Sequence, residues 1–190
     1  MMVSRKVILC CCVITVLFGA SLVLADGHEP LPGERLGKTC ASCHGTDGAS
    51  PGQLIPIIGG QKQGYLATAM KEFAADERPG SVMANLAKGY TAEEQKLIAE
   101  FFAAKPWVNT PHAAAGTEPA TLVKSCQGCH GKNGEGRGSF PRLAGQAPEY
   151  LLEALLEYQQ GERKAMTMAL VKKLDAATLK KMADYYSALK

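Results

Sequence analysis

The pentapeptide Cys-x-x-Cys-His occurs twice in this sequence, at residues 40–44 and again at residues 126–130. This spacing is the attachment signal of a c-type haem, because two thiols one helical turn apart can each form a thioether with a vinyl group of the porphyrin. The histidine that follows the second thiol can then reach the iron from the proximal side. We therefore predict two covalently bound haem c groups. The predicted attachment residues are Cys40, Cys43, Cys126 and Cys129, and the predicted proximal ligands are His44 and His130.

Paired cysteines also occur in zinc sites and in redox-active dithiols. A zinc site does not require a histidine after both cysteine pairs, and it would have to draw its ligands from two motifs that each look complete. A thioredoxin-like motif follows a strand, whereas residues 34–39 and 120–125 resemble short helices. Both comparisons favour the haem.

The N-terminus has the pattern of a secretory signal peptide. Arg5 and Lys6 precede an almost wholly apolar run over residues 7–24, and cleavage is expected after Ala25. The alternative is an uncleaved membrane anchor, because the apolar run is close to the length that spans a bilayer. Cleavage leaves only the cysteines of the haem motifs, so no disulfide framework is expected. Export fits covalent haem attachment, which in bacteria occurs outside the cytoplasmic membrane, and we predict a periplasmic location.

The formal net charge of +3 is unevenly spread along the chain. Residues 26–110 contain two more acidic than basic side chains, and residues 111–190 contain three more basic than acidic ones. This excess is far too weak for a nucleic-acid-binding surface, so no nucleic acid partner is expected. The asymmetry either orients the molecule on charged redox proteins or is the ordinary scatter of solvated charges.

The chain after residue 25 is a tandem repeat. Residues 60–66 match residues 145–151 at an offset of 85, and the same offset pairs Glu77-Arg78 with Glu162-Arg163. We predict a signal peptide over residues 1–25, a first domain over 26–105, a linker over 106–118 and a second domain over 119–190. Each repeat is short enough that its own apolar core is marginal, and a covalently tied haem supplies apolar bulk.

Three helices are predicted in each repeat, and the first carries the haem motif at its C-terminal end. The second begins near Tyr65 in one repeat and near Pro148 in the other. The third begins at a capping box over residues 91–94 in the first repeat and at Asp175 in the second. The intervening segments are rich in glycine and proline and lack strand alternation. The predicted class is all-α with long loops.

The repeat also nominates the second axial ligand of each iron. Met83 follows the second helix of the first repeat, and the offset of 85 carries it onto Met168. Met166 is the alternative, because one residue is missing between this segment and the third helix. Met70 and Met182 instead fit the apolar faces of helices and are predicted to fill the cores. Met83 and Met168 are predicted to lie in irregular segments between helices.

One pair of prolines recurs after the haem motifs. Pro56 follows His44 by twelve residues and Pro141 follows His130 by eleven. A backbone carbonyl at each proline could accept the N–H of the proximal imidazole and fix its orientation, as metal-bound histidines usually require. The alternative is that each proline only shapes the loop around the haem edge.

These features together resemble the dihaem cytochrome c4 family, in which two class I c-type cytochrome domains are joined in tandem. The resemblance covers residues 34–189 and includes the Leu-Ala-Gly-Gln segment at 143–146 and the Gly-Glu-Arg-Lys segment at 161–164. Residues 83–90 are similar to the dihaem cytochrome subunit of flavocytochrome c sulfide dehydrogenase. The resemblance implies His/Met ligation at both irons, two domains packed about a pseudo-twofold axis, and electron transfer between the haems. The shortened segment at 166–168 departs from the family pattern.

Two protein ligands at each iron leave no vacant position for a substrate, which favours outer-sphere electron transfer over catalysis. We therefore expect an electron carrier and not an enzyme, either soluble or loosely associated with a membrane. It would connect a respiratory or dehydrogenase donor to a terminal oxidase or another acceptor. The alternative is the cytochrome subunit of a flavocytochrome c sulfide dehydrogenase, which accepts electrons from its flavoprotein subunit. A haem enzyme such as a peroxidase would require one iron to lose its methionine.

Overall fold

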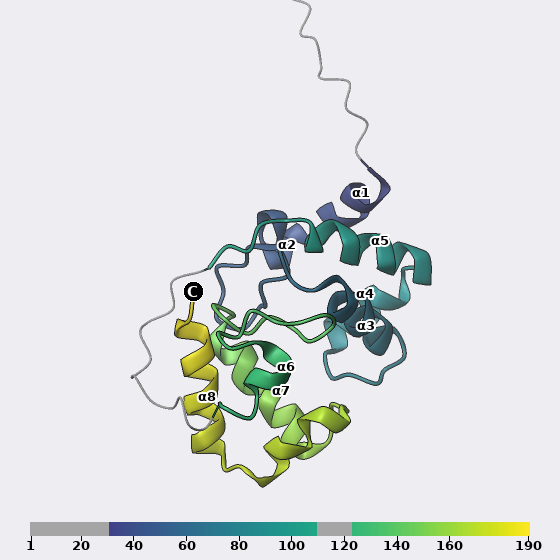
Figure 1. Cartoon of the computed structure of the whole chain (residues 1–190). Coiled ribbons are helices and arrows are strands. Elements are labelled where there is room, and N and C mark those ends of the chain that lie inside the picture. The colour runs from purple at the N-terminus through teal and green to yellow at the C-terminus, as the bar shows by residue number, and fades with distance from the viewer. Residues whose placement is uncertain (1–30, 110–122) are drawn as a thin grey trace, which may run out of the picture.

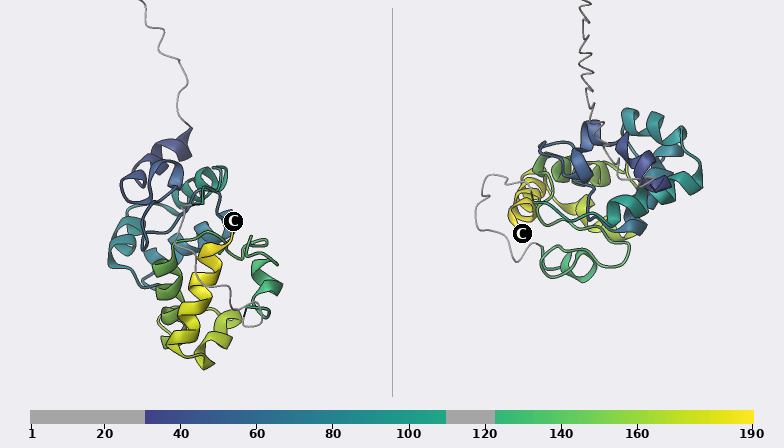
Figure 2. Two further views of the ribbon diagram at one scale, coloured as in Figure 1. Left: turned by 90° about the vertical axis from the view of Figure 1, so that its left-hand side faces the viewer. Right: turned by 90° about the horizontal axis from the view of Figure 1, so that it is seen from above.

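The computed structural model describes residues 31–109 and 123–190, and this part of the chain is helical with long connecting loops. Its only β-type pairing is an isolated bridge between Arg137 and Phe140. The all-α class is therefore confirmed. The helices of the first repeat gather on one side of the molecule and those of the second on the other (Figure 1, Figure 2). The predicted signal peptide and most of the predicted linker lie outside the described residues.

The first repeat is built around one apolar core. Its elements are α1 (Pro32–Lys38), α2 (Ala41–His44), the 3₁₀ turn η1 (Thr46–Gly48), α3 (Gln63–Ala74), α4 (Ser81–Lys88) and α5 (Ala92–Ala103). Helix α1 packs on α5, and α3 packs on both α4 and α5. The buried core consists of Leu66, Met70, Ala87, Ile98, Ala99 and Phe102. Met70 therefore fills the core as predicted.

The second repeat forms a separate core. Its elements are α6 (Gln127–His130), α7 (Pro148–Gln160), the 3₁₀ segment η2 (Met166–Lys173) and α8 (Ala176–Ala188). Helix α7 packs against α8 and η2. The buried residues are Val123, Leu151, Val171, Leu179, Met182, Ala183 and Tyr186. The prediction for Met182 is also confirmed.

The predicted caps of the third helices are present. The Thr91 hydroxyl accepts the Glu94 N–H at 3.3 Å, and the Glu94 carboxylate accepts the Thr91 N–H at 2.7 Å. In the second repeat the Asp175 carboxylate accepts the Thr178 N–H at 2.9 Å. These bonds satisfy backbone donors that have no partner inside the first helical turn, and they determine where α5 and α8 begin.

Two features of the helices differ from the prediction. Met83 lies in α4 and Met168 lies in η2, so neither methionine is in an irregular segment. Helix α4 has no side-chain cap and follows Pro79-Gly80, which is why its sequence resembles a loop. A helix this short depends on tertiary packing, here against α3, and local sequence does not reveal such packing.

The haem motifs also lie in short helices of their own instead of at the end of a longer one. In the first repeat, Thr39 and Cys40 separate α1 from α2. In the second repeat, residues 123–126 form turns before α6 begins. Each motif therefore occupies one tight turn of its own.

We expect Thr91→Ala to lower the free energy of unfolding by about 1 kcal/mol, because the Glu94 N–H loses its acceptor. Chemical denaturation followed by helical circular dichroism measures the change. The control is Thr68→Ala, at an exposed position inside α3, which is expected to leave stability unchanged or slightly higher. Equal losses in the two variants would contradict a capping role for Thr91.

Candidate haem sites

The two histidines of the haem motifs occupy equivalent buried positions. His44 ends α2 and His130 ends α6. The Nδ1–H of His44 donates to the carbonyl oxygen of Pro56 at 2.9 Å, and that of His130 donates to the carbonyl oxygen of Pro141 at 3.0 Å. Nδ1 is thereby used in both rings, which leaves Nε2 as the nitrogen available to a metal.

Burial also sets the protonation state of both imidazoles. Desolvation lowers the pKa of His44 and of His130 below the ordinary histidine value, and the carbonyl hydrogen bonds offset this only in part. Each ring is therefore neutral at neutral pH and can act as a metal ligand without first losing a proton.

The thiols of each motif are separated by one turn of backbone. Cys40 and Cys126 are half-buried, and burial raises the pKa of both thiols. The thiols of Cys40, Cys43, Cys126 and Cys129 are all free. A zinc site built from these cysteines requires at least three His, Cys, Asp or Glu side chains close together. No such cluster occurs in residues 31–109 or 123–190.

The candidate methionines differ in their surroundings. Met83 packs against the core of the first repeat, and Met168 packs against the core of the second. Met166 is 94% exposed and belongs to neither core cluster. The repeat equivalents Met83 and Met168 are thus held by neighbouring side chains, whereas Met166 is held by none of the core residues.

Exposed apolar side chains lie on the segments that carry these donors. Leu54 and Ile55 immediately precede Pro56, Val82 and Leu86 flank Met83, and Leu170 follows Met168. Exposed apolar surface of this kind is stabilised when an apolar group covers it. A neutral imidazole, two thiols and a thioether beside such a surface in each repeat fit haem c.

The two repeats are joined by a reciprocal pair of glutamines. The Gln146 side chain accepts the Ile57 N–H at 2.7 Å and donates to the Ile57 carbonyl at 2.8 Å. The Gln61 side chain accepts the Arg142 N–H at 2.7 Å and donates to the Arg142 carbonyl at 2.9 Å. Gln61 and Gln146 are related by the repeat offset of 85, and so are Ile57 and Arg142. The interface is therefore pseudo-twofold symmetric.

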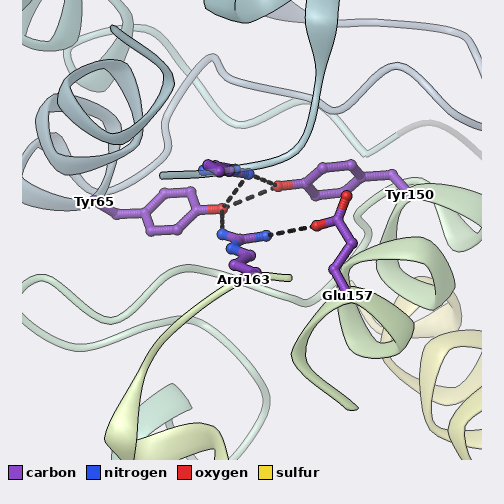
Figure 3. Close-up of polar contacts among 5 residues, drawn as sticks. Tyr65, Tyr150, Glu157 and Arg163 are labelled. Atoms are coloured by element: carbon purple, nitrogen blue, oxygen red, sulfur yellow. Dashed lines mark hydrogen bonds and ion pairs between the residues drawn. The ribbon is translucent and has the colours of Figure 1, made fainter. Parts of the chain in front are cut away.

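A buried cluster of two tyrosines and two arginines lies at the same interface (Figure 3). The hydroxyls of Tyr65 and Tyr150 are 2.9 Å apart. Arg163 donates to Tyr65 at 2.8 Å, and Arg78 donates to Tyr150 at 2.8 Å and to Tyr65 at 3.3 Å. Arg78 and Arg163 are only 7% and 5% exposed. The repeat offset relates the two tyrosines and the two arginines; the tyrosines bond to each other, and each arginine bonds to a tyrosine of the opposite repeat.

The arginines control the acidity of the hydroxyl between them. Burial raises the pKa of Tyr65, but the charges of Arg78 and Arg163 outweigh it and lower the value to about 7. Burial and the neighbouring Tyr65 raise the pKa of Tyr150. Arg163 also pairs with the carboxylate of Glu157 at 3.9 Å. Tyr65 is therefore the hydroxyl of the pair that loses its proton first.

The sequence alone assigns no function to the tyrosines and arginines of this interface, although the repeat offset aligns them in pairs. The offset of 85 already aligned Tyr65 with Tyr150 and Arg78 with Arg163. A repeat alignment shows which residues are equivalent, but it does not show that equivalent residues meet on a symmetry axis.

Two repeats, each with a Cys-x-x-Cys-His turn, a buried imidazole with one free nitrogen and a packed methionine, define a dihaem c-type cytochrome. Residues 113–189 match the family model described as cytochrome c. Cytochrome c-552 of Acidithiobacillus ferridurans is 28% identical over 204 residues, which cover 98% of this chain and 88% of that protein.

Two further proteins match this chain. The cytochrome subunit of sulfide dehydrogenase from Chlorobaculum tepidum is 50% identical over 70 residues, which cover 37% of this chain and 63% of the subunit. The structure of cytochrome c4 from Acidithiobacillus ferrooxidans superimposes with a TM-score of 0.66 at 27% identity and covers 80% of this chain and 99% of that one. The chain is similar to cytochrome c4 over most of its length, and residues 113–189 match the cytochrome c family. It is an electron carrier with two haem c groups and not an enzyme.

In the part of the chain that the structure describes, no helix combines the length and the apolar character needed to cross a membrane.

The lowered pKa of Tyr65 predicts a pH-dependent stability. The folded protein binds fewer protons at this hydroxyl than the unfolded chain between about pH 7 and pH 10, because an unperturbed tyrosine has a pKa near 10. Stability contributed by Tyr65 is therefore present at high pH and is lost as the pH falls through 7. Thermal unfolding of the wild type and of Tyr65→Phe over this pH window measures the effect.

We expect the wild type to gain thermal stability relative to Tyr65→Phe as the pH rises. The control is Tyr90→Phe, which lies outside the cluster and bonds to Thr39. Parallel stability curves for the wild type and Tyr65→Phe would contradict the lowered pKa.

Proposed function

We propose that this protein transfers electrons between redox proteins in the bacterial periplasm through two haems, one ligated by His44 and Met83 and the other by His130 and Met168. The observation that carries the proposal is the buried imidazole of each repeat, with Nδ1 bound to a proline carbonyl and Nε2 free. Export by residues 1–25 and domain limits at 26–105 and 119–190, joined by a linker at 106–118, belong to the same proposal.

Each set of protein groups has a distinct task in this scheme. The bound haem supplies a one-electron couple. Cys40 and Cys43, and likewise Cys126 and Cys129, hold the macrocycle covalently, so it is not lost from a small repeat. The carbonyls of Pro56 and Pro141 orient the imidazoles and increase their basicity. The methionine thioethers favour the ferrous state and raise the potential above that of bis-histidine ligation.

Coordination by protein on both sides supports transfer of electrons and not of atoms. A haem iron held by a histidine and a methionine of the chain would leave no open position for a substrate. The packing of Met83 and Met168 against their cores supports retention of both ligands. The partners in this proposal are a respiratory or dehydrogenase donor and a terminal oxidase or other acceptor.

A second candidate is the electron-accepting subunit of a sulfide-oxidising flavoprotein complex. The match at 50% identity to the cytochrome subunit of sulfide dehydrogenase favours it.

Met168→Ala is expected to abolish methionine coordination at one of the two irons, whereas Met166→Ala leaves both intact. The reason is that Met168 is held by the second core and Met166 is 94% exposed. The red absorbance band of methionine-bound ferric haem measures the change, and about half of its intensity is lost in Met168→Ala. Loss of the band in Met166→Ala alone would assign the ligand to Met166 instead.

Purification from the native host in mild buffer distinguishes the two candidate functions. A lone chain with two covalent haems by mass and a salt-sensitive reaction with an oxidase supports the carrier. Co-elution with a flavin-containing chain that reduces it with sulfide supports the complex subunit. A mass that corresponds to fewer than two haems would contradict both.

A further inference from the structure

A single peptide group connects the proximal histidine of the first repeat to a side chain of the second. The carbonyl oxygen of Pro56 accepts the His44 Nδ1–H at 2.9 Å. The N–H of the same peptide group, which belongs to Ile57, donates to Oε1 of Gln146 at 2.7 Å. Because the peptide group is planar and conjugated, these two bonds act on one electronic unit.

The same arrangement occurs in the opposite direction. The carbonyl oxygen of Pro141 accepts the His130 Nδ1–H at 3.0 Å, and the N–H of Arg142 in that peptide group donates to Oε1 of Gln61 at 2.7 Å. Every atom in this second chain is the repeat equivalent of an atom in the first, with a one-residue difference only at the histidine. The same hydrogen-bonded chain of histidine, peptide group and glutamine in both repeats indicates that it is a regular feature of the interface.

The glutamine side chains are held rigidly at this position. Gln61 and Gln146 are 3% and 2% exposed. Their Oε1 atoms also accept the N–H groups of Lys62 and Ala147, each at 2.9 Å, and their amide nitrogens donate across the interface. Each carboxamide therefore makes contacts with fixed geometry in a region with little water, where hydrogen bonds in series polarise one another.

We propose that Gln61 and Gln146 are positioning residues that act on the proximal histidine of the opposite repeat and so set the reduction potential of the haem that this histidine ligates. An acceptor on the peptide N–H makes the carbonyl oxygen of that group more negative, which strengthens the bond from Nδ1–H. A stronger bond makes the imidazole a better electron donor, which stabilises ferric iron and lowers the potential. This inference rests on the proposed ligands His44 and His130.

The consequence is a crossed effect. Removal of the Gln61 amide in the first repeat is expected to raise the potential of the haem on His130 in the second. Removal of the Gln146 amide is expected to raise the potential of the haem on His44. If each glutamine only held the interface together, its removal would lower stability and would leave the haem potential of the opposite repeat unchanged.

The experiment compares Gln61→Met, Gln146→Met and the wild type as holoproteins with both haems attached. Spectroelectrochemical titration gives the two midpoint potentials. The Nδ1–H resonances of the proximal histidines in the reduced, diamagnetic protein report the strength of each hydrogen bond and identify the repeat that is affected. In Gln61→Met we expect the His130 Nδ1–H resonance to shift in the direction that indicates a weaker hydrogen bond, and the potential of the haem on His130 to rise. The His44 resonance is expected to stay unchanged.

Gln95→Met is the matched control. Gln95 is also buried in the first repeat, but its amide donates only to the carbonyls of Ala87 and Tyr90 in that repeat. It is expected to lose thermal stability like Gln61→Met, with the His130 resonance and its haem potential unchanged.

Gln61→Glu tests the mechanism independently of packing. The carboxylate keeps an oxygen acceptor for the Arg142 N–H and adds negative charge, so the potential of the haem on His130 is expected to fall below the wild-type value. A purely structural role predicts that Gln61→Glu and Gln61→Met shift the potential in the same direction.

The proposal is overturned if Gln61→Met retains two low-spin haems while the His130 resonance and both potentials stay unchanged, or if only the haem of its own repeat responds. If Gln61→Met does not fold, Gln61→Glu and Gln146→Met still test the crossed effect. Failure of the proposed function is recognised separately, because the wild type would then lack two histidine-ligated haems.

Discussion

The hydrogen bond from each proximal imidazole to a proline carbonyl is the constraint on which the rest of the molecule depends. It commits Nδ1 to the protein, leaves Nε2 as the nitrogen available to a metal, and fixes the orientation of the ring at the end of a very short helix. A helix of this length is unstable alone. The carbonyl bond, together with the backbone bonds from His44 to Cys40 and from His130 to Cys126, holds the turn that carries both thiols and the imidazole.

The interface extends this constraint across the molecule. The loops that supply the proline carbonyls also supply the backbone atoms bound by Gln61 and Gln146, so each haem site is built partly from the opposite repeat. Next to these bonds, Tyr65 and Tyr150 separate two buried guanidinium groups, and the shared hydroxyl pair reduces the cost of burying both charges. Joining the repeats therefore contributes to the sites themselves as well as to their proximity.

The sequence predicts those features that depend on local chemistry or on a motif. The haem motifs, the caps at Thr91 and Asp175, and the all-α class all follow from short-range patterns. Helix α4 could not be predicted in the same way, because it lacks a cap and is stabilised by packing on α3. The pairing of Gln61 with Arg142 depends on how two folded units meet, and nothing in the neighbouring sequence specifies that geometry.

The reciprocal bonds between Gln61 and Arg142 and between Gln146 and Ile57 are made to backbone atoms, which any residue except proline provides at those positions. The interface is isologous, like that of a C2 homodimer, although both halves belong to one chain. The side chains at these equivalent positions differ: Ile57 is buried, whereas the guanidinium of Arg142 lies 4.8 Å from the centre of the Trp107 ring. A symmetric backbone contact thus permits different side chains at equivalent positions, so the surroundings of the two candidate haem sites differ within a nearly symmetric molecule.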